Sequence, residues 1–258
     1  MRCTPVANNP ILNHEIDGND YEVYVDHSTK TIIIKATYYT KKGDVTSAAE
    51  AKTYTEYWNK LSGEFQYKVG KGKEAKLYNV NFELNTKEVE SPAKKLESIT
   101  TMKDGGIDEE TGMGILIAEQ NRIDPKANTF EVLSRAEFDK KKKEYGGGDA
   151  VEGYVYKGNQ VGMPITSKMD KGLTGPHEIG HTLGIEHFLG TIMGANDIDI
   201  KNKVKADLIS VILGHAGITS NFIKDGVNND AQTTVTTKGS DPKGFKGGRV
   251  KASKKVKK

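Results

Sequence analysis

The sequence predicts an α+β fold, and three observations lead to that class. Alternating apolar and polar residues, the period of a half-buried strand, recur several times before residue 166. Apolar residues spaced three to four apart, the period of a helix, mark several longer segments. The chain of 258 residues is long enough to bury one sizeable core, and it contains no apolar run of the length that crosses a bilayer.

The first predicted elements are a β-hairpin and a helix. We expect strands at residues 21–26 and 31–40, because the first alternates and the second contains three consecutive isoleucines, with a turn-like His-Ser-Thr-Lys between them. Residues 46–61 have helical apolar spacing, and Thr46 or Ser47 is the candidate N-cap.

The rest of the predicted domain mixes strands with helices. We expect strands at residues 64–69, 76–84, 113–118, 130–133, 153–157 and 160–166. A charged helix is expected at 136–145. A second, amphipathic helix is expected at 203–214, where Gly214 is the natural stop.

Both ends of the chain are expected to lie outside the main domain, which we place at 21–220. Residues 1–20 contain two prolines, four asparagines and few apolar residues, which is typical of an irregular lead-in. Residues 221–258 are polar and basic, and we expect them to lack a fixed structure. Their last 21 residues hold nine Lys or Arg and one acid, a net charge of +8. This tail is a candidate for binding an anionic surface or nucleic acid, and a solvated flexible end is the simpler interpretation.

The cysteine count and the N-terminus bear on where the protein acts. The single cysteine, Cys3, excludes an intrachain disulfide framework. Residues 1–11 have no apolar segment of the kind found in a signal peptide. A chain without such a segment stays inside the cell, leaves by a non-classical route, or is a mature or truncated piece of a longer protein. Among these we expect a monomer that is extracellular or exported by a non-classical route.

The residues that carry chemistry lie at 177–187, in the order His-Glu-Ile-Gly-His-Thr-Leu-Gly-Ile-Glu-His. His177 and His181 are four residues apart, so they share a helix face and can bind one ion together. Glu178 would lie beside that ion and reach a water molecule on it without being a ligand.

The end of this motif predicts a third ligand. Gly184 can adopt the left-handed conformation that ends a helix, after which the chain can return His187 to the ion. Three neutral imidazoles leave the fourth tetrahedral position open, which is typical of a catalytic zinc site.

This pattern resembles the extended motif of the metzincin clan of zinc endopeptidases, His-Glu-x-x-His-x-x-Gly-x-x-His, at every fixed position. Met193, six residues after His187, is similar to the methionine that the clan carries in a tight turn beneath the metal. Ala195 stands where some members have a tyrosine ligand, which implies only water beside the three histidines.

The resemblance also implies a fold and an activity. The fold is compact and matrixin-like: a mixed, twisted sheet with two long helices in an upper subdomain, and a small, mostly irregular or helical lower subdomain after Gly184. The activity is zinc-dependent hydrolysis of peptide bonds, with Zn²⁺ activating water and Glu178 acting as general base. Protein or peptide substrates would bind extended along an edge strand, for which 153–157 is the candidate. The candidates for accepting the second N–H of the zinc-bound imidazoles are Glu186, Asp197 and Asp199.

Other interpretations stay open. Short zinc-peptidase domains of this kind resemble the C-terminal parts of bacterial polymorphic toxins, so a proteolytic toxin or effector with a narrow protein target is one alternative. A non-catalytic zinc-containing binding module with a basic tail is another, and Glu178 argues against it because a structural zinc needs no such base. The Arg2-Cys3 pair is similar to the matrixin latency element, although an incidental cysteine is the simpler interpretation.

Overall fold

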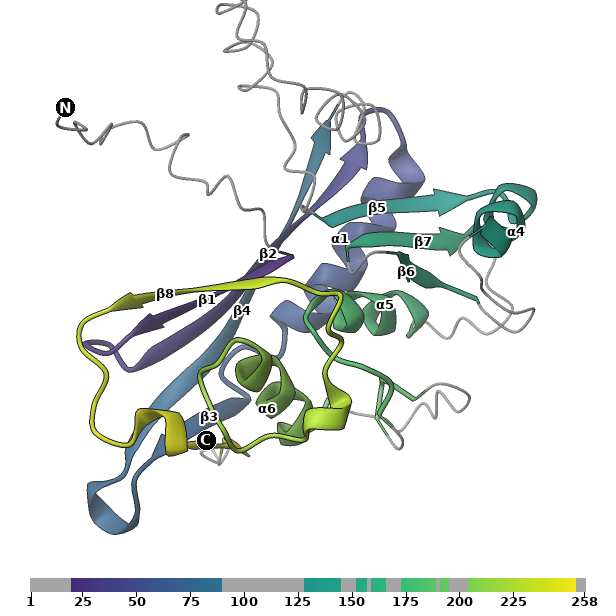
Figure 1. The fold of residues 1–258 in the computed structure, drawn as a ribbon. Helices are drawn as coiled ribbons and strands as arrows, with labels where there is room; N and C mark the ends of the chain where they lie inside the picture. The colour runs from purple at the N-terminus through teal and green to yellow at the C-terminus, as the bar shows by residue number, and fades with distance from the viewer. Residues whose placement is uncertain are drawn as a thin grey trace, which may run out of the picture.

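The structure is a computed structural model in which a large mixed sheet lies against helices (Figure 1). It describes residues 20–89, 128–144, 152–156, 159–165, 173–188, 191–194 and 204–253. Outside these residues lie Cys3 and the rest of the lead-in up to residue 19, the strand expected at 113–118, Ala195, Asp197, Asp199 and residues 254–258. None of the described helices is long and apolar enough to span a membrane.

The central strand is β2 (Thr31–Lys41), and the sheet branches around it. One edge of β2 pairs in parallel with β4 (Lys76–Val89) along its whole length. The other edge pairs first with β1 (Tyr21–Asp26), antiparallel, and then near Tyr38 with β5 (Asn128–Leu133), parallel. The predicted hairpin is therefore confirmed, and β1 and β5 diverge from β2 in different directions (Figure 1).

Further strands extend the sheet on both sides of β2, some parallel and some antiparallel to their neighbours. Beyond β5 come β7 (Gln160–Pro164), parallel, and then β6 (Tyr154–Tyr156), antiparallel and at the edge. Beyond β4 come β3 (Phe65–Val69) and β9 (Arg249–Ala252), both antiparallel, while β8 (Thr233–Lys238) pairs in parallel with β1. The strand expected at 153–157 thus does lie at an edge of the described sheet.

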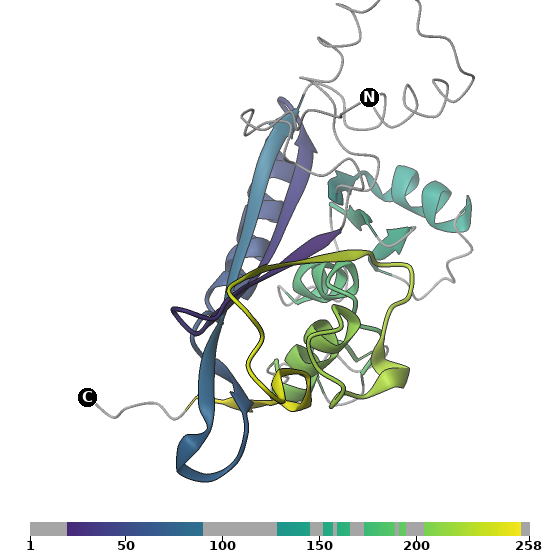
Figure 2. The same ribbon diagram turned by 60° about the vertical axis from the view of Figure 1, so that its left-hand side comes forward.

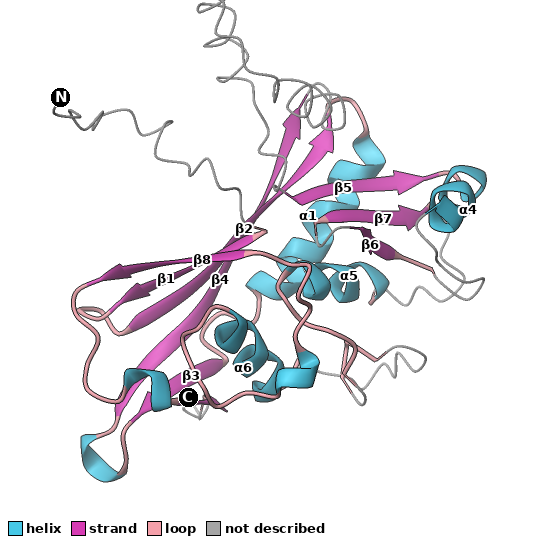
Figure 3. Cartoon of the chain, viewed as in Figure 1, coloured by secondary structure: helices cyan, strands magenta, loops and turns pink. Residues whose placement is uncertain are grey.

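The described residues form four α-helices beside this sheet, so the expected α+β class with a mixed sheet is confirmed (Figure 3). They are α1 (Val45–Asn59), α4 (Arg135–Glu144), α5 (Thr174–Thr182) and α6 (Ala206–His215). Three short 3₁₀ helices are also described: η1 (Gly72–Glu74), η2 (Lys224–Gly226) and η3 (Phe245–Gly247). Both views place α5 and α6 on the same side of the sheet (Figures 1 and 2).

The core lies where these helices meet the inward face of β2 and β4. Alternate residues of both strands are buried there, and their neighbours face outward. Trp58 of α1 is fully buried, with its ring against Phe82 of β4 at a centroid distance of 5.6 Å. The period-2 pattern of the sequence therefore reports one-sided burial, as expected for a sheet covered on one face.

Three local expectations are corrected by the structure. Asp44, rather than Thr46 or Ser47, caps α1: its carboxylate accepts the Ser47 N–H at 3.0 Å, because the helix starts at Val45 and its third amide is then the reachable one. Gly214 does not end α6, which continues to His215, and the Phe222 ring occupies the space that a side chain at Gly214 would fill. Of the two helices expected to be long, α1 has 15 residues but α5 has only nine.

The expectation that residues 221–258 lack a fixed structure is wrong for 221–253. Strands β8 and β9 add to β1 and β3, so the lower part of the molecule after Gly184 is not only irregular and helical. Phe245 is only 4% exposed and contacts the rings of Tyr67 and Tyr78, each at a centroid distance of 5.3 Å. The physical reason is that the backbone of this segment is hydrogen-bonded to β1 and β3, so few apolar side chains are needed to hold it in place.

Candidate metal centre

The helix that carries the motif, α5, is anchored at both ends by side chains from other elements. Near its start, the indole N–H of Trp58 donates to the Pro176 carbonyl at 2.9 Å. At its end, the Thr182 hydroxyl donates to the Ile179 carbonyl and lies 2.6 Å from the hydroxyl of Tyr38. All nine residues of α5 are buried, so the motif is held rigidly between α1 and the sheet.

The two helix histidines face each other, as their four-residue spacing predicts. Their Nε2 atoms lie 3.1 Å apart, and the ring centroids are separated by 4.7 Å. The Nδ1 atom of His177 lies 2.8 Å from the Ile192 carbonyl, and that of His181 lies 2.7 Å from the Ile185 carbonyl. A carbonyl can only accept, so each Nδ1 carries the proton and donates it. In the neutral rings the two Nε2 lone pairs then point at the same place, where a shared cation would bind both.

The chain leaves α5 through a turn that brings back the third histidine. Gly184 has a φ of 81°, in the left-handed region. The Ile185 amide donates to the Gly180 carbonyl at 3.1 Å and the Gly184 amide donates to the His181 carbonyl at 3.0 Å, which together form a Schellman motif. The predicted role of Gly184 as the helix stop is therefore confirmed.

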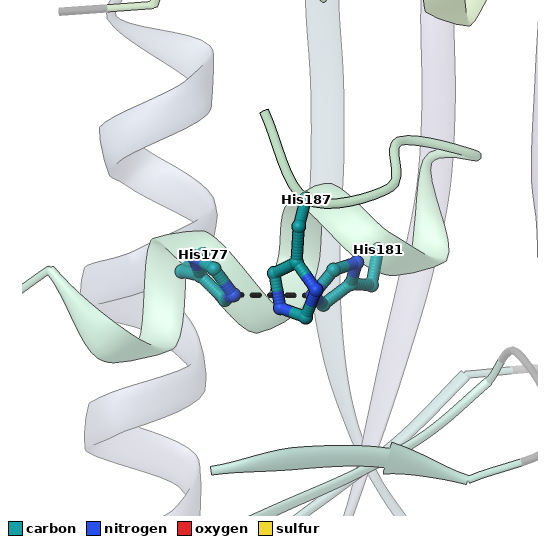
Figure 4. Close-up of side chains that lie close together, drawn as sticks. All are labelled: His177, His181 and His187. Carbon is teal, nitrogen blue, oxygen red and sulfur yellow. Dashed lines mark hydrogen bonds between the residues drawn. The ribbon is translucent and has the colours of Figure 1, made fainter. Parts of the chain in front are cut away.

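His187 completes the group. Its ring centroid lies 5.3 Å from that of His177 and 4.8 Å from that of His181. The three ligand nitrogens all lie within 4.8 Å of one another. Figure 4 shows the three rings turned toward a common point, two from α5 and one from the chain that follows it.

This donor set fits a tetrahedral divalent ion. Zn–N bonds of roughly 2.0–2.1 Å require ligand nitrogens about 3.3 Å apart, close to the spacing of the helix pair. His187 is exposed, so its side chain can move closer to the other two imidazoles and bind the same ion. Burial, together with the charges of the neighbouring histidines, lowers the pKa of His177 to about 4 and that of His181 to about 3. Both rings are therefore neutral near pH 7, the form that binds a metal.

No family model matches the chain, and neither the curated proteins nor the solved structures give a match. The site is therefore interpreted from its own geometry. Among the described residues, the three histidines are the group of potential ligands that could hold a metal ion.

Glu178 follows His177 in α5 and is buried, but it is not part of this group. It is 5% exposed, and burial raises the pKa of its carboxyl to about 8. Its carboxylate lies against Gly153, next to the edge strand β6: a Cβ placed on Gly153 would be 2.5 Å from Oε1 of Glu178. The carboxyl group is thus held between the motif helix and the edge of the sheet.

Met193 lies beneath α5, where its sulfur packs against Gly180. It is fully buried, and its amide donates to the Thr191 hydroxyl at 3.0 Å in a tight turn. The residue before it, Ile192, supplies the carbonyl that orients His177. The turn therefore supports both the helix and one ring of the candidate centre.

The residues that orient the imidazoles differ from those expected. The Nδ1 protons of His177 and His181 go to backbone carbonyls, whereas the carboxylate of Glu186 faces the His187 amide at 3.4 Å. Asp197 and Asp199 lie outside the described residues. Sequence offers no signal for these carbonyl acceptors, because every residue has a carbonyl.

Proposed function

We propose that the protein is a zinc-dependent endopeptidase of the metzincin clan. His177, His181 and His187 bind the metal, and Glu178 is the general base. The observation that carries the proposal is the convergence of three imidazoles, two of them neutral through burial, beside a carboxyl group that is not a ligand. A purely structural zinc would be expected to have a fourth protein ligand instead.

In the proposed reaction, the metal, Glu178 and two backbone carbonyls have separate roles. When bound, Zn²⁺ supplies a Lewis acid that polarises a peptide carbonyl and lowers the pKa of water toward ~7. The charge of a bound Zn²⁺ would lower the raised pKa of the Glu178 carboxyl again. Its carboxylate would then accept the proton of the attacking water and deliver it to the departing amine. The carbonyls of Ile185 and Ile192 hold the His181 and His177 rings in the tautomer that presents Nε2.

The edge strand β6 supports an extended peptide as the substrate. It ends one branch of the described sheet, and an extended peptide can add to a sheet at such an end as a further strand. Gly153, just before β6, lies against Glu178, so a peptide bound at this edge would lie near the proposed base. Backbone pairing of this kind recognises an extended main chain and leaves side-chain preference to neighbouring pockets.

Metal analysis combined with a peptide-library assay tests this function. The parent protein should hold stoichiometric zinc at neutral pH and cleave internal peptide bonds. Chelation should abolish cleavage, and added zinc should restore it. The His187→Ala variant is the matched control: its exposed side chain can be removed without disturbing the core, yet zinc binding should fall. Cleavage that survives chelation, or a parent protein that holds no zinc, would contradict the proposal.

The same library distinguishes a general endopeptidase from an effector with a narrow target. Cleavage of many unrelated sequences favours the first. Cleavage confined to one short sequence favours the second.

A further inference from the structure

The turn between His181 and His187 is held by a segment from much later in the chain, Gly226–Asn228, which we call the clasp. The Glu186 amide donates to the Gly226 carbonyl at 2.8 Å, and the Asn228 amide donates to the Gly184 carbonyl at 3.0 Å. Between these bonds, Ile185 and Val227 form an isolated antiparallel bridge. The clasp therefore acts as a short partner strand for the residues that lead to the third histidine.

The side chain of Asn228 adds a contact to the motif helix itself. Its Nδ2 donates to the His181 carbonyl at 3.1 Å, while its Oδ1 accepts the Asp230 amide at 3.0 Å. Asn228 is 9% exposed, so these bonds are shielded from water. One residue thus joins the carbonyl of the second candidate ligand to the turn that brings in the third.

The clasp also orients the ring of His181. The Ile185 carbonyl accepts the Nδ1 proton of His181 at 2.7 Å, and Ile185 is the residue bridged to Val227. A shift of the clasp would therefore move two things together: the acceptor that fixes the His181 ring and the path of the chain to His187. Gly226 packs closely beneath Phe188 and Val211, which holds the clasp against α6.

We propose that Asn228 is a positioning residue of the metal centre: through its bonds to the His181 and Gly184 carbonyls, it fixes the separation of the second and third ligands and so raises the affinity for the ion. This inference rests on the proposed metal site, and it is independent of whether the bound metal cleaves peptides.

Two substitutions and one matched control test it. Asn228→Ala removes the side-chain bonds. Asn228→Ser keeps an oxygen for the Asp230 amide but is too short to reach the His181 carbonyl. Asn221→Ala is the control, because Asn221 also donates its Nδ2 to backbone carbonyls, those of Gly247 and Gly248 at 3.0 and 3.1 Å, but at the β9 side of the molecule.

Zinc affinity is measured by competition with a chromophoric chelator, and ligand geometry by the visible absorption spectrum of the Co²⁺-substituted protein. Thermal unfolding of the metal-free protein serves as the readout of folding. Both Asn228 variants should bind zinc about 10–100-fold more weakly and show a shifted Co²⁺ spectrum. Asn221→Ala should lower the unfolding temperature to a similar extent without changing either metal readout.

A zinc affinity within about twofold of the parent in both Asn228 variants, with an unchanged Co²⁺ spectrum, would overturn the proposal. Equal weakening in Asn221→Ala would overturn it as well, since the effect would then be general destabilisation. A parent protein that binds no zinc refutes the metal site itself. A parent that binds zinc but cleaves nothing refutes only the peptidase function.

Discussion

The carboxylate of Glu178 rests against the backbone of Gly153, so the base candidate on the motif helix and the residue before the edge strand are in direct contact. Any side chain at position 153 would compete with the carboxylate for the same space. The position of the carboxylate thus depends on a residue with no functional group of its own.

Gly153→Ala should reduce peptide cleavage while leaving zinc in place. The added Cβ would lie 2.5 Å from Oε1 of Glu178 and 2.9 Å from its Cδ and Cγ, so the carboxylate must move. A misplacement of about 1 Å in a catalytic group can cost roughly 100-fold in rate, and we expect a loss of that order in kcat/KM. Steady-state kinetics and zinc content measure the two effects.

Gly247→Ala is the control for this substitution, because nothing lies within 4 Å of a Cβ built at Gly247. It should leave both kinetics and zinc content unchanged. Full activity in Gly153→Ala would show that the carboxylate position in the structure is not the one used in the reaction.

Glu178→Ala should keep zinc and lose cleavage. The candidate ligands are the three imidazoles and not this carboxylate, so zinc binding should persist. Loss of a general base costs roughly 10²–10⁴-fold in kcat. Zinc content and single-turnover kinetics of purified protein provide the measurement. A variant that cleaves as fast as the parent would refute the assigned mechanism.

Much of the upper sheet and of the site follows from sequence, because both depend on local spacing. The alternation in β2 and β4 arises from burial of one face, and the pairing of His177 with His181 arises from helix geometry. Gly184 was also predictable, since a helix that must turn back sharply favours a residue without a side chain.

The C-terminal contribution could not be predicted in this way. β8 consists largely of threonine and has no apolar alternation, and β9 has only four residues, so neither resembles a buried strand. Both are stabilised by pairing with strands about 200 residues earlier, as in the pairing of Thr233 with Tyr21, across a separation of 212 residues. Contacts between such distant residues leave no periodic signal in one sequence.

Phe245→Ala should destabilise the protein, because the buried Phe245 ring packs the C-terminal segment against aromatic residues of the core. Its ring lies among those of His27, Tyr67 and Tyr78. Truncation of a buried phenylalanine costs about 3–5 kcal/mol in the free energy of unfolding. Urea denaturation measures this change.

Val235→Ala, at an exposed position of β8, should cost less than about 1 kcal/mol and is the control. If the two variants unfold at the same urea concentration as the parent, residues 221–253 do not pack as described.

Acid should destabilise the fold partly through His215. Burial lowers the pKa of its imidazole, whose Nδ1 lies 2.8 Å from the Tyr21 hydroxyl. The unfolded chain therefore binds the proton more tightly, so the contribution of His215 to stability is fully present above about pH 6.5 and is lost as the pH falls.

The metal-free parent and His215→Gln are compared by urea unfolding at about pH 7.5 and about pH 5. The free energy of unfolding of the parent should fall further between these values than that of the variant. His177 and His181 are present in both proteins, so their effect cancels in the difference. An equal fall in both would exclude His215 as the cause.

The pairing of β8 with β1 and of β9 with β3 has a consequence for biosynthesis. A ribosome adds about 5–20 residues per second, so β1 and β3 wait for roughly ten seconds or more before their partners have been made. During that time their edges can pair with other chains, which favours aggregation. The clasp is synthesised in the same late segment, so a metal centre positioned by the clasp, as proposed above, would form only after residues 226–228 have left the ribosome.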